Sequence, residues 1–354
     1  MPESFQEENK NKRLVELDSL RGFAAMAVVM AHLGLSIWKE HNFFRLGVSG
    51  VDLFFLISGY VIYMSFKRIS KTSEFIISRI GRLFPSYWLA VIGTFLLFFI
   101  WSSYTEMPQK YSLYDLMANL TMFQYYFKSV NVLAVSWTLL IEMLFYIFML
   151  CLFQFKLLNK IELIISISIL PILIYSIFLK SNAAYLYNPI HFYFPLINHL
   201  PLFYAGILFY RVSLFKKNTF RIILIISCLI LQITLFPHGG SNKDFMTENE
   251  YIFILLLFFL LFALLKNKKL SFINNPMTSF LGKISYSLYL IHLYPSGLLI
   301  AVITKYFQLN IWFVIILIVL PLLFIFSYLL YRYIELPGIK GSKNYINKGL
   351  KVSL

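Results

Sequence analysis

The chain of 354 residues contains 59% hydrophobic and 19% aromatic residues but only 13% charged ones. Soluble domains carry about 25% charged residues, so this composition excludes a soluble enzyme, a disordered chain and a disulfide scaffold. The 31 lysines and arginines exceed the 16 acids and give a net charge of +15. In a membrane protein such an excess reports topology rather than nucleic-acid binding.

Ten apolar runs are long enough to span a membrane, which takes about 20 residues. In chain order they fall near residues 18–38, 47–66, 86–103, 134–155, 161–179, 195–212, 219–237, 250–266, 280–304 and 311–335. Residues 104–133 predict an interfacial or re-entrant helix. The predicted fold is therefore an all-α integral membrane protein with one ten-helix domain over 18–335. We expect tails over 1–17 and 336–354, the first of them with four glutamates and not a cleavable signal peptide.

Basic residues predict the orientation of these spans. If the N-terminus is cytoplasmic, the cytoplasmic segments hold 23 of the basic residues and the opposite loops hold seven. Such a bias in short loops is typical of inner-membrane proteins. We therefore expect a multi-pass protein of the inner (plasma) membrane with both termini in the cytoplasm.

Ionisable residues within the spans indicate a functional or structural role, because inserting each one into the membrane costs roughly 2.5–3.5 kcal/mol of free energy. At 1.5 Å per residue, His32, Asp52, Glu142 and His292 fall at comparable depths, about 8–12 Å below the outer face for the first three. A carboxylate that binds one imidazole nitrogen makes the other nitrogen a better base. His32 and Asp52 are therefore predicted to form a catalytic dyad; the alternative is that His32 only bonds a backbone carbonyl between helices.

The other two ionisable residues keep two interpretations each. Glu142 either orients a substrate hydroxyl or balances a buried cation. His292 is either a second polar contact in the substrate cavity or a packed group of the core. Ser136 and Trp137, at the start of the same run as Glu142, are predicted to contact an acceptor sugar, although Ser136 fits a plain helix N-cap equally well. No metal site is predicted.

Two arginines mark a second chemical cluster at the cytoplasmic side. Arg79 and Arg82 stand three residues apart and so share one face of a helix. Arginine suits phosphate recognition, with Arg21 and Lys283 as helpers. The alternative is that this segment only sets orientation and contacts anionic lipid.

Six motifs together resemble the acyltransferase 3 family of integral-membrane acyltransferases. They are LDSLRGFAAMAVVMAH, GVDLFFLISGYVI, SRIGRLFPSYW, SWTLLIEMLFY, LGKISYSLYLIH and YIELP, which lie between residues 17 and 337. In this resemblance the family's essential arginine and histidine fall on Arg21 and His32. Its acid after the GV pair falls on Asp52, and its paired arginines fall on Arg79 and Arg82.

The chain departs from the family pattern at Ser19, where glycine is usual, and at Thr138, where serine is usual. The match is to the stand-alone form, without the hydrolase-like domain of some members. The resemblance implies transfer of an acyl group, usually acetyl, from acyl-coenzyme A to a hydroxyl of a cell-envelope or surface glycan, polysaccharide or lipid-linked. No tightly bound cofactor is expected, and the sequence leaves the oligomeric state open.

The resemblance implies that His32 deprotonates the acceptor hydroxyl, with a covalent acyl-histidine as the variant mechanism. The distance from Arg21 to His32, about 16 Å along a helix, suits a donor whose phosphates bind the arginines. Two alternatives remain: a multi-span transporter or flippase for glycan or lipid-linked intermediates, and the same enzyme with a succinyl or longer acyl donor. The lack of visible two-half symmetry favours the enzyme.

Overall fold

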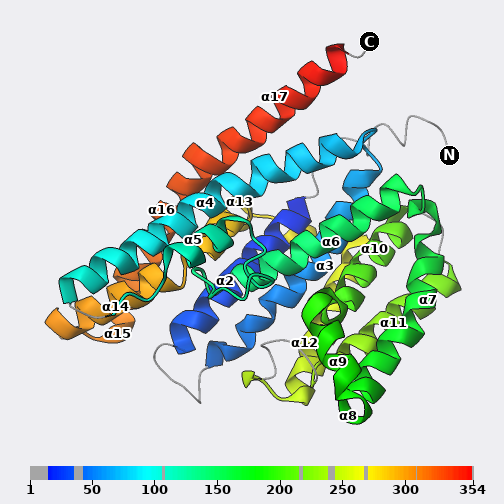
Figure 1. Cartoon of the computed structure of the whole chain (residues 1–354), viewed down its shortest axis with the longest axis horizontal. Coiled ribbons are helices and arrows are strands. Elements are labelled where there is room, and N and C mark those ends of the chain that lie inside the picture. Colours follow the sequence, from blue (N-terminus) through cyan, green and yellow to red (C-terminus); the bar gives the residue numbers. More distant parts are fainter. Residues whose placement is uncertain are drawn as a thin grey trace.

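Figure 1 shows the protein as a computed structural model. The structure describes residues 15–35, 43–105, 108–214, 218–237, 244–266, 270–307 and 309–352. Within these ranges the fold is all-helical and contains no β-strand, as the sequence predicts. Most of the expected tail 1–17, and several of the basic residues counted for orientation, lie outside the described residues.

The helices follow one another with short connections. The first half of the chain contains α2 (Val15–Leu35), η1 (Phe43–Ser49), α3 (Gly50–Phe66), α4 (Thr72–Thr105), α5 (Leu113–Leu120), α6 (Ser136–Gln154), η2 (Leu158–Lys160), α7 (Ile161–Ile174) and η3 (Tyr175–Leu179). The second half contains α8 (Lys180–Asn182), α9 (Ala184–Tyr193), η4 (Pro195–Asn198), α10 (Leu200–Leu214), α11 (Thr219–Leu235), α12 (Glu248–Lys266), η6 (Ser271–Ile273), α13 (Pro276–Ile291), α14 (Tyr294–Phe307), α15 (Ile311–Val314), η7 (Ile315–Val319), α16 (Leu320–Leu330), η8 (Tyr331–Glu335) and α17 (Leu336–Val352).

Six helical segments among the described residues are long and apolar enough to cross a membrane, or seven if the bent pair α13 and α14 counts as one crossing. The other three of the ten expected runs correspond to α2, α10 and α11. Helices α10 and α11 have 15 and 17 residues, fewer than the roughly 20 of a full crossing. Helix α2 has 21 residues but carries Glu16, Asp18 and Arg21 near its start.

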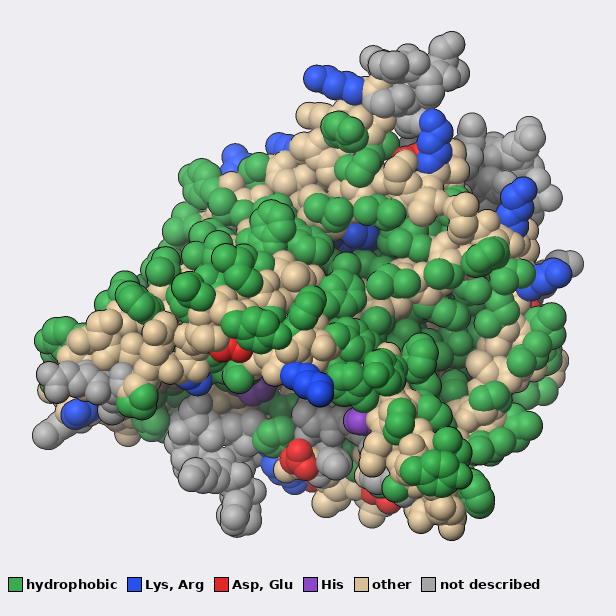
Figure 2. Space-filling view, viewed as in Figure 1, with side chains coloured by type: hydrophobic (Ala, Val, Ile, Leu, Met, Phe, Trp, Pro, Cys, Tyr) green, Lys and Arg blue, Asp and Glu red, His purple; other side chains and the backbone are tan. Residues whose placement is uncertain are grey.

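The exterior of the molecule is apolar. Figure 2 shows hydrophobic side chains over most of the visible face, with many of the Lys and Arg side chains toward its edges. Large side chains such as Ile100, Leu170 and Phe253 are more than 60% exposed, at 65%, 62% and 69%. An outward-facing apolar surface of this extent fits lipid and not water as the surrounding solvent.

Helix α2 lies in the middle of the molecule and packs along α13 (Figure 1). A Cβ atom on Gly282 would lie 2.2 Å from the carbonyl oxygen of Asp18, so the two backbones approach more closely than any other residue allows. The two helices run in the same direction, because Asp18 lies against Gly282 and His32 against His292. This packing brings the histidines of two distant segments together.

The predicted span 280–304 is not one continuous helix. Helix α13 ends at Ile291, α14 begins at Tyr294, and the two are bent by 71°. Pro295 gives the physical reason, since a proline ring clashes with the carbonyl four residues earlier, here that of Ile291, and disfavours helix at the preceding residue. The sequence interpretation assumed that His292 lies inside a continuous helix. In the structure His292 lies at the break between α13 and α14.

Candidate active site

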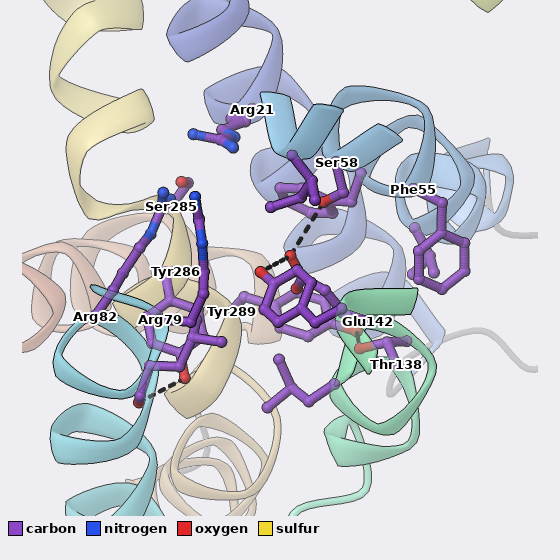
Figure 3. Close-up of a pocket in the computed structure, with 16 residues that line it drawn as sticks. Arg21, Phe55, Ser58, Arg79, Arg82, Thr138, Glu142, Ser285, Tyr286 and Tyr289 are labelled. Atoms are coloured by element: carbon purple, nitrogen blue, oxygen red, sulfur yellow. Dashed lines mark hydrogen bonds between the residues drawn. The ribbon is translucent and has the colours of Figure 1, made fainter. Parts of the chain in front are cut away.

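A small cavity lies where α2, α3, α4, α6 and α13 meet. It has a volume of about 70 Å³ and is lined by Arg21, Ser58, Arg79, Arg82, Glu142, Tyr146, Tyr286 and Tyr289 among others. Figure 3 shows the guanidinium groups of Arg21, Arg79 and Arg82 directed to the same space beside Ser285. Residues from five helices thus build one polar cavity inside an apolar bundle.

Other polar and aromatic side chains contact the guanidinium groups of the arginines. Arg79 donates from Nη2 to the hydroxyl oxygen of Ser65 at 3.0 Å, and its guanidinium stands 5.6 Å from the ring centroid of Tyr146. Nε of Arg79 is buried and has no hydrogen-bond partner in the described part of the chain. Arg21 lies 3.8 Å from the carboxylate of Asp18. An unpartnered buried donor among three arginines is what an anion site requires.

Glu142 is the carboxylate on the wall of this cavity. Its Oε1 accepts hydrogen bonds from the hydroxyls of Ser58, at 3.1 Å, and of Tyr146 (Figure 3). Ser58 lies six residues beyond Asp52 on α3, about 9 Å further along the helix. Glu142 is therefore deeper than the layer predicted from helix depth, and its place beside three arginines matches the second role considered from the sequence, the balance of buried cations.

Glu335, a residue that the sequence analysis left without a role, stands close to the same arginines. It is 3% exposed and accepts a hydrogen bond from the hydroxyl of Ser287 at 2.8 Å. Its carboxylate acts electrostatically on Arg82 and Arg21. Glu335 belongs to the motif YIELP. As a charged residue within an apolar segment, it could have been identified from the sequence as a candidate site residue.

The two histidines expected at similar depth do meet. Nε2 of His292 lies 2.9 Å from Nδ1 of His32, and Nδ1 of His292 lies 2.8 Å from the carbonyl oxygen of Tyr289. His292 is fully buried, and protein atoms engage both of its ring nitrogens. These contacts favour the second interpretation given for His292, a packed group of the core, and the predicted substrate contact stays a prediction.

Asp52 is 1% exposed and forms a side-chain hydrogen bond with Tyr251 of α12. Asp52 thus contacts α12, whereas His32 contacts His292 at the end of α13. The predicted dyad of His32 with Asp52 stays a prediction, and the imidazole partner that the structure provides for His32 is His292.

Tyr289 connects the cavity to the histidine pair. Its hydroxyl and that of Thr138, which also lines the cavity, are 2.9 Å apart, and its ring centroid is 5.6 Å from that of His292. Tyr286, Tyr289 and His292 follow one another at intervals of three residues, a spacing that places them on one side of α13. That spacing could have identified the two tyrosines, to which the sequence analysis assigned no role.

Six of the ten predicted site residues do not line the cavity: His32, Asp52 and His292, whose contacts are given above, and Lys283, Ser136 and Trp137. Lys283 is exposed on α13. Ser136 is buried, donates to the carbonyl of Leu133 and accepts from Gln124 at 2.8 Å, so its hydroxyl ties the preceding loop to α6. The ring of Trp137 packs 5.7 Å from that of His199.

The structure is a membrane-embedded helical bundle in which a buried arginine cavity lies next to a histidine pair. The chain belongs to the acyltransferase 3 family, because residues 14–332 match the family's acyltransferase domain. It is therefore a membrane acyltransferase, and the transporter considered from the sequence is disfavoured.

Relatives share this description. The chain is 28% identical over 309 residues to a predicted acetyltransferase of Acidianus two-tailed virus, covering 83% of this chain and 86% of the relative. It is 27% identical over 377 aligned positions to a predicted O-acetyltransferase of Staphylococcus aureus (strain COL), covering 95% of this chain and 60% of that protein. A 53-residue segment is 45% identical to exopolysaccharide production protein ExoZ of Rhizobium meliloti, 15% of this chain and 17% of ExoZ.

The chain thus spans less than two thirds of the staphylococcal protein. No solved structure matches the chain.

Proposed function

We propose that this protein is an O-acyltransferase that moves an acetyl group from acetyl-coenzyme A to a hydroxyl of a cell-envelope or surface glycan. This proposal rests on the convergence of Arg21, Arg79 and Arg82 in one buried cavity. Arg21 lies eleven residues before His32 on α2. Phosphate groups suit clustered guanidinium groups, and a thioester at the end of a pantetheine arm reaches about 16 Å further. The ExoZ name supports a polysaccharide acceptor.

In this proposal His32 removes the proton from the acceptor hydroxyl, which attacks the thioester carbonyl. Glu142 offsets part of the positive charge of the three arginines when no anion is bound.

The directions of the helices support ten crossings with both termini on one side. Helices α3 and α6 run in the same direction, because Ser58 contacts Glu142 and Phe66 contacts Phe153. Helix α12 shares that direction, since Arg45 binds Glu250 and Tyr60 packs on Phe262. These are even-numbered spans of the predicted ten, which must be parallel in such a topology.

The test uses membrane vesicles from cells that express the protein, radiolabelled acetyl-coenzyme A and the envelope glycan fraction as the counted product. Wild-type protein is expected to label the glycan, and His32→Ala to abolish the label at equal abundance in the membrane. Labelling by His32→Ala at the wild-type rate would remove His32 from the reaction.

The donor site is tested in the same assay. Arg79→Lys keeps the charge but loses the planar fork, so we expect KM for acetyl-coenzyme A to rise about tenfold or more. Lys71→Gln, an exposed residue outside the cavity, is the matched control and should leave KM unchanged. Equal KM values in both variants would return the arginine pair to a purely topogenic role.

A further inference from the structure

The buried ring of His292 makes two contacts that determine which of its nitrogens carries hydrogen. Nδ1 lies 2.8 Å from the carbonyl oxygen of Tyr289. A carbonyl oxygen only accepts hydrogen bonds, so Nδ1 is the donor. In a neutral imidazole the other nitrogen then has a lone pair, and Nε2 of His292 is a hydrogen-bond acceptor.

This acceptor fixes the state of the second ring. Nε2 of His292 is 2.9 Å from Nδ1 of His32, so Nδ1 of His32 donates. In a neutral ring Nε2 of His32 therefore carries the lone pair.

We propose that His292 is a positioning residue which sets the tautomer of His32, so that Nε2 of His32 is the general base for the acceptor hydroxyl. The inference rests on the proposed function, since it assigns a role within that acyl transfer. His292 replaces the carboxylate that usually holds a catalytic histidine in this way. It does not touch the substrate, because both of its ring nitrogens are engaged by protein atoms.

The proton balance of the transfer follows from this assignment. Nε2 of His32 takes the proton of the acceptor hydroxyl while the hydroxyl oxygen forms a bond to the thioester carbonyl carbon. His32 is then an imidazolium whose Nδ1–H is held by the lone pair on Nε2 of His292. The carbon–sulfur bond breaks, the proton on Nε2 passes to the leaving thiolate, and His32 returns to its starting tautomer. No oxidant or further reactant is needed.

The break between α13 and α14 is what presents His292 in this way. His292 follows the last residue of α13, and its own backbone carbonyl accepts a hydrogen bond from the hydroxyl of Ser296. The bend at Pro295 turns the chain away after His292. Contacts of this kind also occur in continuous helices, as between Ser65 and Val61, so the 71° bend and not the Ser296 contact marks the break.

The experiment compares two substitutions of His292 in the vesicle assay with radiolabelled acetyl-coenzyme A. His292→Gln places an amide oxygen near the position of Nε2 and can still accept from Nδ1 of His32. His292→Leu has a similar length and no acceptor. We expect His292→Leu to lower kcat at least about tenfold, since an oriented general base contributes 10²–10⁴-fold. KM for acetyl-coenzyme A should stay within about twofold, and His292→Gln should recover most of kcat.

His191→Gln is the matched control, a histidine of α9 outside the pair, and should keep the wild-type kcat. The proposal is overturned if His292→Leu keeps the wild-type kcat, or if the Gln and Leu variants are equally impaired at equal abundance, because a packing role alone would produce the second result. Absence of label with wild-type protein would instead contradict the proposed function. The two failures are therefore distinguishable.

Discussion

The hydroxyl of Ser58 on α3 donates a hydrogen bond to Oε1 of Glu142 on α6 at 3.1 Å, beside three arginines (Figure 3). This carboxylate shares the cavity wall with the guanidinium groups of Arg21, Arg79 and Arg82. Buried like charges repel strongly, so a carboxylate between them stabilises the empty cavity. The contact therefore links the packing of α3 on α6 to the charge balance of the site.

The first prediction concerns this charge. Glu142→Gln removes the negative charge but keeps the shape, and we expect it to destabilise the protein by about 1.5–3 kcal/mol, the range for hydrogen bonds to a charged group. The midpoint of thermal unfolding in detergent measures this change. Asp244→Asn, at an exposed position, is the control and should leave the midpoint unchanged. An unchanged midpoint for Glu142→Gln would show that the arginines need no counter-charge.

The second prediction concerns the contact of α3 with α10. A Cβ atom on Gly59 would lie 2.1 Å from the carbonyl oxygen of Phe203, so Gly59→Ala forces the helices apart. We expect a loss of about 3 kcal/mol or more, seen as a lower unfolding midpoint. Gly93 of α4 has nothing within 4 Å of such an atom. Gly93→Ala should therefore raise stability by up to about 1 kcal/mol, and equal effects of the two substitutions would contradict the packing.

The third prediction is a pH dependence of α5, a short helix outside the candidate spans. Asp115 accepts from the backbone N–H and hydroxyl of Ser112, at 2.9 and 2.6 Å, and from the hydroxyl of Ser129 at 2.7 Å. Burial raises the pKa of Asp115, but hydrogen bonds from Ser112, Ser129 and the Val130 N–H outweigh it and lower the pKa to about 2.

Because the pKa is depressed in the folded state, the stabilisation of α5 by Asp115 is complete above the unfolded pKa of about 3.9 and is lost as pH falls through about 2. Hydrogen exchange of Leu113–Leu120, corrected for the intrinsic rate, should become faster as the pH is lowered from 5 to 2. Asp115→Asn should show faster exchange at pH 5 and little further change on acidification. A wild-type helix with the same protection at both pH values would contradict this role.

The sequence predicted the all-helical membrane fold and the arginine cluster, because charge in an apolar run is conspicuous. It did not place Glu142 correctly, since counting the rise per residue from an assumed helix start ignores how helices tilt and cross. It treated 280–304 as one helix because the apolar pattern continues through the break, although Pro295 was a usable signal. The contact of His32 with His292 joins residues 260 positions apart and depends on the packing of Gly282 against α2.

The cavity wall has three cationic side chains and one anionic one, with Asp18 and Glu335 placed behind. These three carboxylates equal the three guanidinium groups in formal charge, so the site is close to neutral before any donor arrives. An anionic donor must therefore compete with carboxylates that already neutralise the arginines, and its net affinity is lower than three unpaired arginines would give.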